Sequence, residues 1–392
     1  MRAKRTTLLR AAKAPTKGAR RRPKTRAREA KGNAREAKGK MQSSTPSEFD
    51  AARLEGFLRA RVNGAHGAYF HLERISGGQS NPTYFVTIGN RLLVMRKKPA
   101  GATLRSAHAI DREYRVLKAL AETDVPVPRV ALYCDDDSVV GTPFYVMDRL
   151  EGRIFADAAL PGVSPAERET MYFSMAETLA KLHDIDPVVV GLSDYGAIGN
   201  YFARQINRWT KQYHGARWRD LPDVERLIEW LPSHVPPEDE TRISHGDFRM
   251  GNLCFHPTEP RVIGVLDWEL STLGEPLADL AYSALGQITE PQEFGGLRGL
   301  NLAALGIPTR PRYFERYFVS RKTPSRAPLR PFHTVFALFR LAVIFEGIAA
   351  RARTGSAASA DAAEVGELSA VFARRAMECV EGDTDSPGLR ES

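Results

Sequence analysis

The chain has 392 residues, of which 43% are hydrophobic and 26% are charged, as expected for a large globular domain or for two lobes. The formal charge of +9 does not indicate nucleic-acid binding by the folded part. Residues 1–40 hold 16 Lys/Arg against 2 Glu, a local net charge of +14, so residues 41–392 carry −5.

Residues 1–40 are low in complexity and contain no aromatic residue, so they cannot bury enough apolar surface to fold. One interpretation is a basic arm for nucleic acid or a membrane surface, or an Arg-rich organelle presequence. The other is a disordered tail, or a start placed too far upstream, with Met41 opening the working protein. We favour the second interpretation and expect no specific nucleic-acid partner.

The segment up to residue 150 is predicted to be rich in short strands. Gly89 and Asn90 form a typical two-residue hairpin turn between two of them. In chain order the expected elements are a helix at residues 47–61, strands at 71–75, 83–88 and 91–97, a helix at 105–121, and a second hairpin with strands at 130–134 and 144–149.

Helical patterns dominate after residue 152. Ser164 to Glu167 is typical of a capping box, and the apolar face of the helix that follows is expected to be core. A helix at residues 201–213, short strands at 253–255 and 262–266, and mostly helix beyond complete the pattern. The predicted class is α+β, divided into a tail (1–40), a β-rich N-lobe (41–150), a larger α-rich C-lobe (151–380) and a flexible C-terminus (381–392).

Two further features bear on the compartment. The odd number and wide spacing of the cysteines indicate reduced thiols in a cytoplasmic protein, not a disulfide framework or a zinc site; they are Cys134, Cys254 and Cys379. The most apolar run, residues 335–350, contains Arg340 and Glu346 and is too short to span a membrane. We therefore expect a core helix there and no membrane span.

A polar run between two apolar strands, ISHGDFRMGNLCF, occupies residues 243–255. Polar side chains in such a place are costly to bury unless they serve a function. Phosphoryl transfer needs one carboxylate to orient the attacking hydroxyl, a second carboxylate and an amide oxygen for Mg²⁺, and a cation for the phosphates. Asp247, Asp267, Asn252 and Arg249 have these types, although each acid alone is also typical of a cap or a turn.

Residues upstream are consistent with a nucleotide site. Gly78, Ser80 and Asn81 lie in the turn after the first strand, where backbone N–H groups can approach phosphates, although a plain hairpin loop fits equally well. Arg96 ends a strand where kinases carry a phosphate-binding lysine. Lys97 is the second choice, because strand alternation turns it to the other face.

The following helix and the end of the small lobe add to this pattern. Glu113 is expected to pair with Arg96; the alternative is an exposed partner for its charged helical neighbours. Backbone groups around Tyr145 and Met147 are expected to read adenine, with apolar side chains on the faces of the ring. His183 is expected to be structural, since lone helix histidines rarely do chemistry.

Together these stretches resemble the aminoglycoside phosphotransferase and choline kinase superfamily over about residues 50–350. The most similar branch consists of kinase-like domains found alone or alongside acyl-CoA dehydrogenases. The resemblance implies a protein-kinase-like two-lobe fold with ATP and Mg²⁺ as cofactors. It is carried by SGGQSNPTYFV, VMRKKP, HAIDREYRVLKAL, PFYVMDRLEGR, HGDFRMGNLCFHP and GVLDWELSTLGEPLADLAY.

The same resemblance implies roles for individual residues. His245 is expected to brace the polar loop, and Asp279 to support it through buried hydrogen bonds. Trp268 and Glu269 stand where protein kinases have Phe-Gly, so no regulatory flip is implied. The implied site consists of Asp247 as the catalytic aspartate, Asn252 and Asp267 as metal ligands, Arg249 near the transferring phosphate, and Arg96 with Glu113 at the nucleotide.

We therefore predict a phosphotransferase that acts on a hydroxyl group of a small molecule. Residues 285–353 are apolar and Arg-rich, which suits a hydroxyacyl compound of the CoA type better than a polycation, although core helices with Arg on their wet faces explain the same composition. An aminoglycoside- or choline-type kinase and a non-catalytic nucleotide-binding protein remain as alternatives. A protein kinase is disfavoured, because no A-P-E segment follows Asp267.

Overall fold

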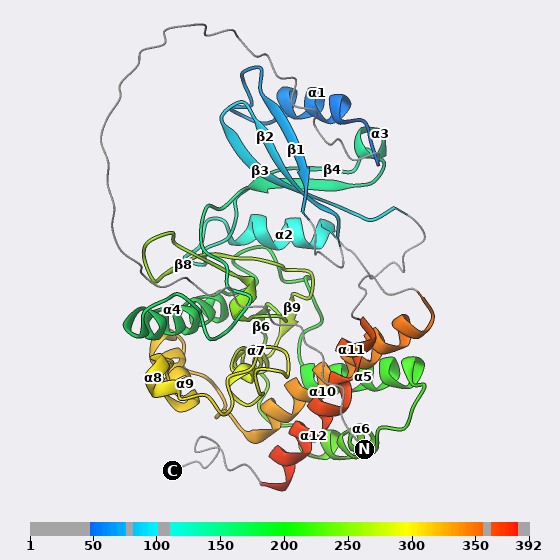
Figure 1. Cartoon of the computed structure of the whole chain (residues 1–392), viewed down its shortest axis with the longest axis vertical. Coiled ribbons are helices and arrows are strands. Elements are labelled where there is room, and N and C mark those ends of the chain that lie inside the picture. Colours follow the sequence, from blue (N-terminus) through cyan, green and yellow to red (C-terminus); the bar gives the residue numbers. More distant parts are fainter. Residues whose placement is uncertain (1–47, 76–80, 101–109, 356–361, 383–392) are drawn as a thin grey trace, which may run out of the picture. The chain divides into compact units, whose positions relative to one another are not determined.

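The computed structural model describes residues 48–75, 81–100, 110–355 and 362–382. Contacts divide the chain into residues 1–42 and residues 43–392, and every described residue belongs to the second unit. That unit consists of a small lobe built on a sheet and a larger helical lobe (Figure 1). The α+β class predicted from the sequence is confirmed.

The small lobe contains a five-stranded antiparallel sheet in the order β1-β2-β3-β5-β4. Every strand lies within one residue of its predicted bounds: β1 (Phe70–Arg74), β2 (Thr83–Ile88), β3 (Arg91–Lys97), β4 (Val130–Cys134) and β5 (Phe144–Asp148). The register places Arg96 opposite Thr83 on one side and Tyr145 on the other. The side chains of Arg96 and Tyr145 therefore share one face of the sheet.

Three helices accompany the sheet. α1 (Ala51–Arg61) begins at residue 51 rather than 47, because the Asp50 side chain caps its first turn. α2 (Ile110–Leu120) packs on β4 and β5, and the first part of the helix expected there lies outside the described residues. α3 (Asp137–Val140) is a single turn at the tip of the second hairpin.

The large lobe begins with α4, whose start differs in detail from the prediction. The Ser164 hydroxyl accepts the N–H of Glu167, but the Glu167 carboxylate pairs with Arg153 at 2.7 Å instead of completing a capping box. The helices are α4 (Pro165–Asp184), α5 (Tyr201–Ala216), α6 (Pro222–Ser233), α7 (Pro276–Ser283), α8 (Leu302–Leu305), α9 (Arg310–Ser320), α10 (Pro331–Arg353), α11 (Ala362–Gly366) and α12 (Leu368–Glu381), with 3₁₀ turns η1 (Met250–Asn252) and η2 (Leu285–Gln287).

Two short antiparallel pairs shape the segment between α6 and α7. β7 (Leu253–Phe255) and β8 (Val262–Val265) form the predicted hairpin, with β8 one residue shorter than expected. β6 (Arg242–Ser244) pairs with β9 (Thr272–Gly274), which the sequence pattern did not indicate, since strands of three residues show too little alternation. Together the two pairs bring residues 245–252 beside residues 266–271.

α10 is the central helix of the large lobe, in contact with α5, α7, α11 and α12 (Figure 1). The core helix expected at residues 335–350 is confirmed, and its charged residues have partners. Arg340 donates a hydrogen bond to the Gly246 carbonyl, and Glu346 accepts hydrogen bonds from Arg219. Within the described ranges, no helix combines the length and apolar character needed to cross a membrane.

Candidate active site

A cleft of about 460 Å³ lies between the sheet and the polar segments of the large lobe. This volume is within the usual range of small-molecule sites. Its walls are largely apolar, with Val94 and Met147 from the sheet and Trp268 from the large lobe. Its polar lining includes Arg96 and Asp267, which are far apart in the sequence.

Glu113 is the centre of a buried cluster on the small-lobe side of the cleft. Its side chain is 1% exposed and accepts hydrogen bonds from the Asn81 amide at 2.8 Å and the Tyr145 hydroxyl at 2.9 Å. The Arg96 guanidinium lies 3.2 Å from the Glu113 carboxylate and 3.2 Å from that of Asp267. The ion pair expected between Arg96 and Glu113 is present, and Glu113 is not the exposed helical partner of the alternative.

The electrostatics of this cluster fix its protonation. Burial alone would lower the pKa of Arg96, but the Glu113 carboxylate, with Tyr145 and Asp267, outweighs burial and raises that pKa above its ordinary value. Burial and then Glu113 raise the pKa of Tyr145 well above its ordinary value, so the phenol keeps its proton and donates a hydrogen bond to Glu113. Arg96 is therefore a fixed cation held at the edge of the cleft.

Lys97, the second choice for that cation, faces the other way. It is 3% exposed, and its ammonium donates to the Val140 carbonyl at 2.9 Å. Strand alternation therefore separates the two neighbours as expected, and Arg96 is the one that lines the cleft.

The polar loop, residues 245–252, is braced from α7. The Asp279 carboxylate, 1% exposed, accepts the backbone N–H groups of His245 at 2.6 Å and Gly246 at 3.0 Å. Gly246 has φ +81°, and a Cβ there would lie 2.6 Å from the Leu270 carbonyl oxygen, so the tight approach requires glycine. The backbone of the loop is therefore fixed before any ligand binds.

His245 connects the polar loop to the segment after β8. Its Nε2 donates to the Leu266 carbonyl at 2.9 Å, and its Nδ1 accepts the backbone N–H of Asp247 at 3.1 Å. The backbone N–H of Leu266 in turn donates to the Asn252 carbonyl at 2.8 Å. Both nitrogens of the imidazole are engaged, so His245 holds the loop and is not free to act as a base. His183 is also buried, with its Nδ1 2.7 Å from the Tyr317 hydroxyl.

The Asp247 carboxylate is held from three directions. Its Oδ1 accepts the Tyr282 hydroxyl at 2.5 Å, and its Oδ2 accepts the Asn252 amide at 2.7 Å and the Arg249 Nε at 3.3 Å. Burial and the Asp247 charge raise the pKa of Tyr282 well above its ordinary value, so its hydroxyl remains the donor. These charge-assisted bonds fix the rotamer of Asp247.

Asn252 and Asp267 are suited to hold a hard cation. The Asn252 amide nitrogen is used by Asp247, which leaves its oxygen for a cation, and the Asp267 carboxylate is 36% exposed toward the cleft. Asp267 has φ +64°, a left-handed conformation that is costly for a non-glycine residue and is typical of functional sites. No cluster of three or more His, Cys, Asp or Glu that could hold a metal occurs in the described segments. One carboxylate and one amide are what Mg²⁺ uses when phosphates and water complete its shell.

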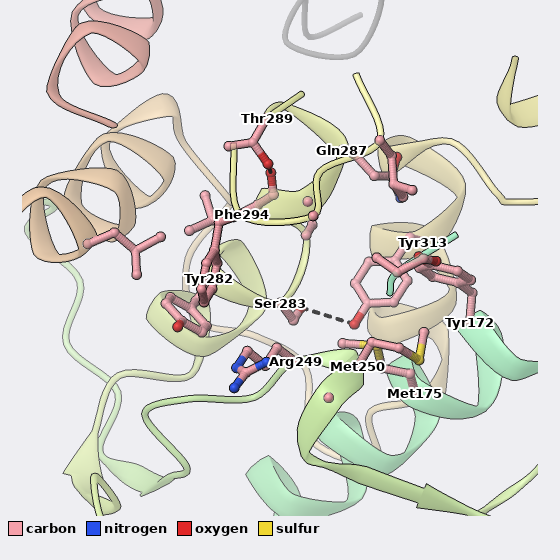
Figure 2. Close-up of a pocket in the computed structure, with 18 of the residues that line it drawn as sticks. Tyr172, Met175, Arg249, Met250, Tyr282, Ser283, Gln287, Thr289, Phe294 and Tyr313 are labelled. Carbon is pink, nitrogen blue, oxygen red and sulfur yellow. Dashed lines mark hydrogen bonds between the residues drawn. The ribbon is translucent and has the colours of Figure 1, made fainter. Parts of the chain in front are cut away.

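A second pocket is lined by two of the residues that are bonded to Asp247. Tyr282 and Arg249, both bonded to Asp247, line it, together with Tyr172 and Met175 of α4 and Tyr313 of α9 (Figure 2). Its cavity of about 90 Å³ is several times what one water molecule needs. Among its described lining residues there is no Asp or Glu, and Arg249 is the only one with a charge. We call this the acceptor pocket.

Comparison with known families gives a match over residues 71–332 to the phosphotransferase enzyme family. The chain belongs to this family. Acyl-CoA dehydrogenase family member 10 of Mus musculus is 44% identical over 328 residues, which cover 83% of this chain and 30% of that protein. Family member 11 of Homo sapiens is 41% identical over 321 residues, which cover 80% and 41%. The phosphotransferase chain thus spans less than half the length of these relatives.

Solved structures of similar proteins show the same fold. A crystal structure from Ralstonia eutropha, of a protein provisionally named an aminoglycoside phosphotransferase, has a TM-score of 0.77 and 43% identity and covers 85% of this chain and 99% of its own. A spectinomycin phosphotransferase, solved with ADP and spectinomycin, has a TM-score of 0.57 and 11% identity over 85% and 99%, and shares the fold. The protein-kinase-like two-lobe fold is confirmed.

The structure gathers most of the residues singled out in the sequence of this phosphotransferase. Gly78 and Ser80 lie outside the described residues, so the turn predicted to hold phosphates is not placed. The others meet at the cleft or beside it: Asn81, Arg96, Glu113, Tyr145, Met147, Asp247, Arg249, Asn252 and Asp267.

Sequence reasoning missed the residues of the large lobe that hold the candidate site. Tyr282 follows Asp279 by three residues, about one turn of α7, so its helical spacing was a usable signal. Arg340 of α10 braces Gly246, and its guanidinium carbon lies 5.2 Å from the Tyr282 ring centroid. Nothing in the sequence pattern connects α10 to the polar loop, since the two are about ninety residues apart.

Proposed function

We propose that this phosphotransferase transfers the γ-phosphoryl group of ATP to a hydroxyl group of a small molecule, with Mg²⁺ as cofactor. One observation carries the proposal: the Asp247 carboxylate is hydrogen-bonded to residues that line the cleft and to residues that line the acceptor pocket. Asn252 lines the cleft, Tyr282 and Arg249 line the pocket, and all three contact the Asp247 carboxylate. A nucleotide in the cleft and an alcohol in the pocket would therefore meet at this carboxylate.

The chemistry needs few protein groups. The acceptor oxygen forms a bond to the γ-phosphorus, the bond from that phosphorus to the β,γ-bridging oxygen breaks, and ADP leaves. Asp247 orients the hydroxyl and takes its proton, while Arg96 and Arg249 offset the charge of the phosphates. Asn252 and Asp267 would hold Mg²⁺, which would supply further neutralisation of the phosphate oxygens.

The lining of the acceptor pocket favours an apolar or anionic acceptor. A polycationic aminoglycoside needs carboxylates to replace its lost hydration, whereas the described lining offers aromatic rings, methionines and Arg249. The curated relatives carry the name acyl-CoA dehydrogenase. A hydroxyacyl compound of the CoA type therefore fits better than an aminoglycoside or a choline-like amine.

A nucleotide-binding protein without catalysis is the rival from another class. Such a protein needs the Glu113 cluster but has no use for an Asp247 carboxylate held between two cavities. The bonds from Tyr282, Asn252 and Arg249 hold that carboxylate in one orientation. This arrangement suits a group that must accept a proton in a defined direction.

Thermal unfolding and turnover together test the proposal on the full chain. ATP with Mg²⁺ should raise the melting temperature of the wild type and of Asp247→Asn, and should raise it little in Asp267→Ala. In the wild type, ADP release should require an acceptor, which is tested with a hydroxyacyl-CoA ester, a choline-like amine and an aminoglycoside in turn. This acceptor-dependent release should be lost in Asp247→Asn. No nucleotide-dependent shift at millimolar ATP would overturn the proposal, and a shift without turnover on any acceptor would favour the non-catalytic rival.

A further inference from the structure

One wall of the acceptor pocket is formed by a loop between η2 and α8, which we call the acceptor loop (residues 289–298). Thr289, Phe294, Gly295 and Leu297 of this loop line the pocket. Figure 2 labels Thr289 and Phe294. Its backbone folds on itself, with the N–H of residue 296 donating to the carbonyl of residue 290 at 3.0 Å and the N–H of residue 298 to that of residue 289 at 2.8 Å. It is a compact loop without helix or strand, and such loops are often functional.

Phe294 is unusual within the acceptor loop. It is 51% exposed although it is a large aromatic residue, and its backbone has φ +65°. A left-handed conformation is costly for a bulky residue and persists only where the surroundings impose it. Its ring packs edge-on against Phe345 at 5.2 Å between centroids, and the Arg249 guanidinium carbon lies 5.8 Å from the ring centroid. An exposed aromatic ring is thus held between α10 and the polar loop.

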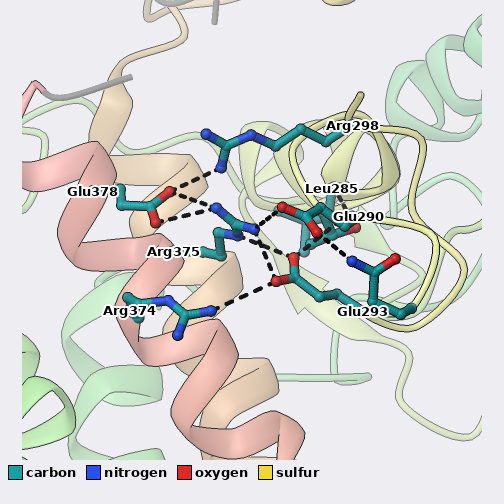
Figure 3. Close-up of polar contacts among 9 residues, drawn as sticks. Leu285, Glu290, Glu293, Arg298, Arg374, Arg375 and Glu378 are labelled. Atoms are coloured by element: carbon teal, nitrogen blue, oxygen red, sulfur yellow. Dashed lines mark hydrogen bonds and ion pairs between the residues drawn. The ribbon is translucent and has the colours of Figure 1, made fainter. Parts of the chain in front are cut away.

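Arg375 of α12 forms ion pairs with the acceptor loop (Figure 3). Its Nε and Nη2 donate to both oxygens of Glu293 at 3.0 and 2.8 Å, and its Nη2 also donates to Glu290 at 2.8 Å. Its Nη1 donates to Glu378 at 2.9 Å, which in turn accepts from Arg298 at 2.9 Å. The side chains of Arg375 and Glu293 are both 8% exposed, so solvent screens this pair little. Residues 290 and 293 of the acceptor loop are therefore attached to α12 through Arg375, and residue 298 is attached to the same helix through Glu378.

The same helix also reaches the pocket directly. Phe372 lines the acceptor pocket and precedes Arg375 by three residues, so the two side chains lie on neighbouring positions of α12. Glu293, one residue before Phe294, receives two of the Arg375 hydrogen bonds. The attachment point is thus next to the strained residue, where it can impose the left-handed backbone.

We infer that Phe294 is a specificity-determining residue of the acceptor pocket and that Arg375 is the positioning residue that holds it there; the inference rests on the proposed function. Phe294 closes the pocket with an apolar face beside Arg249, which suits an acceptor whose hydroxyl lies near Asp247 and whose hydrocarbon part passes the ring. The ring limits the length or width of that part. Arg375 touches neither cleft nor acceptor and acts only through the acceptor loop.

The experiment compares a short-chain and a long-chain hydroxyacyl-CoA ester, by calorimetric binding to the nucleotide-free full chain and by ADP release. In Phe294→Ala the preference for the short ester over the long one should fall on the order of 10-fold, because the apolar wall is gone. The KM for ATP should not change, since Phe294 does not line the cleft. Arg375→Met and the milder Glu290→Gln should shift the preference in the same direction.

A double-variant comparison separates positioning from general damage. In the Phe294→Ala background, Arg375→Met should cause no further change in preference, because the ring that it positions is absent. Arg219→Met is the matched control: it also removes an arginine from a buried carboxylate, Glu346 of α10. Neither Arg219 nor Glu346 lines the pocket, so this substitution should lower the melting temperature without changing the preference.

The outcomes distinguish the inference from the proposed function. Altered binding preference without turnover would support the inference and overturn the kinase proposal. Turnover with an unchanged preference in Phe294→Ala would overturn the inference and keep the kinase. An Arg375→Met shift that persists in the double variant, or equals that of Arg219→Met, would overturn the positioning role. Absence of binding of either ester to the wild type would overturn the inference, while the nucleotide shift still tests the kinase.

Discussion

Replacing Tyr282 with phenylalanine tests whether the orientation of Asp247 controls turnover. The substitution removes one hydroxyl, which donates to the Asp247 Oδ1 at 2.5 Å, and leaves the ring against Arg340. A hydrogen bond to a charged group contributes about 1.5–3 kcal/mol, which corresponds to a loss of about 10- to 150-fold in kcat if it is used in the transition state. The KM for ATP should stay unchanged, because Tyr282 lines the acceptor pocket and not the cleft.

The assay is ADP release with whichever acceptor gives turnover, beside the melting temperature with ATP and Mg²⁺. Tyr313→Phe is the matched control. Tyr313 of α9 lines the same pocket. Its hydroxyl donates to Ser283, the neighbour of Tyr282 on α7, at 3.0 Å and does not bond to Asp247 (Figure 2). If Tyr282→Phe lost no more kcat than Tyr313→Phe, the reasoning would be refuted. A raised KM for ATP would refute it as well, since it would place Tyr282 at the nucleotide.

Three further predictions concern the charged groups. Arg96→Met should raise the KM for ATP about 10-fold or more, because a cation fixed at the cleft is lost. Lys97→Met should change the melting temperature and not that KM, because Lys97 bonds to Val140 on the other face of the sheet. Steady-state kinetics measures both variants, and an equal rise in the KM for ATP would contradict the assignment of Arg96. Asp267→Ala should lower kcat/KM by several orders of magnitude, which added Mg²⁺ should not restore. Burial raises the pKa of Glu275 from 4.5 to about 8. Its folded pKa is higher than its unfolded pKa, so the stability it contributes is present below pH 4.5 and is lost as the pH rises toward 8. Glu275→Gln should flatten this slope, by at most about 5 kcal/mol, in urea titrations on both sides of that window; an unchanged slope would contradict the burial argument.

Much of the nucleotide side was predictable because its signals are local. Strand alternation placed Arg96 on the cleft face and Lys97 on the opposite face, since side chains alternate strictly along a strand. The spacing of Asp247 and Asn252 fits one short loop, and a single hairpin brings Asp267 beside it. Such relations depend on a few consecutive residues, whose dihedral angles and turn preferences the sequence specifies directly.

The sequence by itself thus determined the fold class and several of the residues at the cleft, while the tertiary structure alone decided which residues meet at the second pocket. The bond from Tyr282 to Asp247, the brace from Arg340 and the hold of Arg375 on the acceptor loop join segments far apart in the chain. Each depends on how α7, α10 and α12 pack in the large lobe. Helical periodicity shows that a residue faces inward but not which distant residue it will meet, because that pairing is fixed only when the helices pack together.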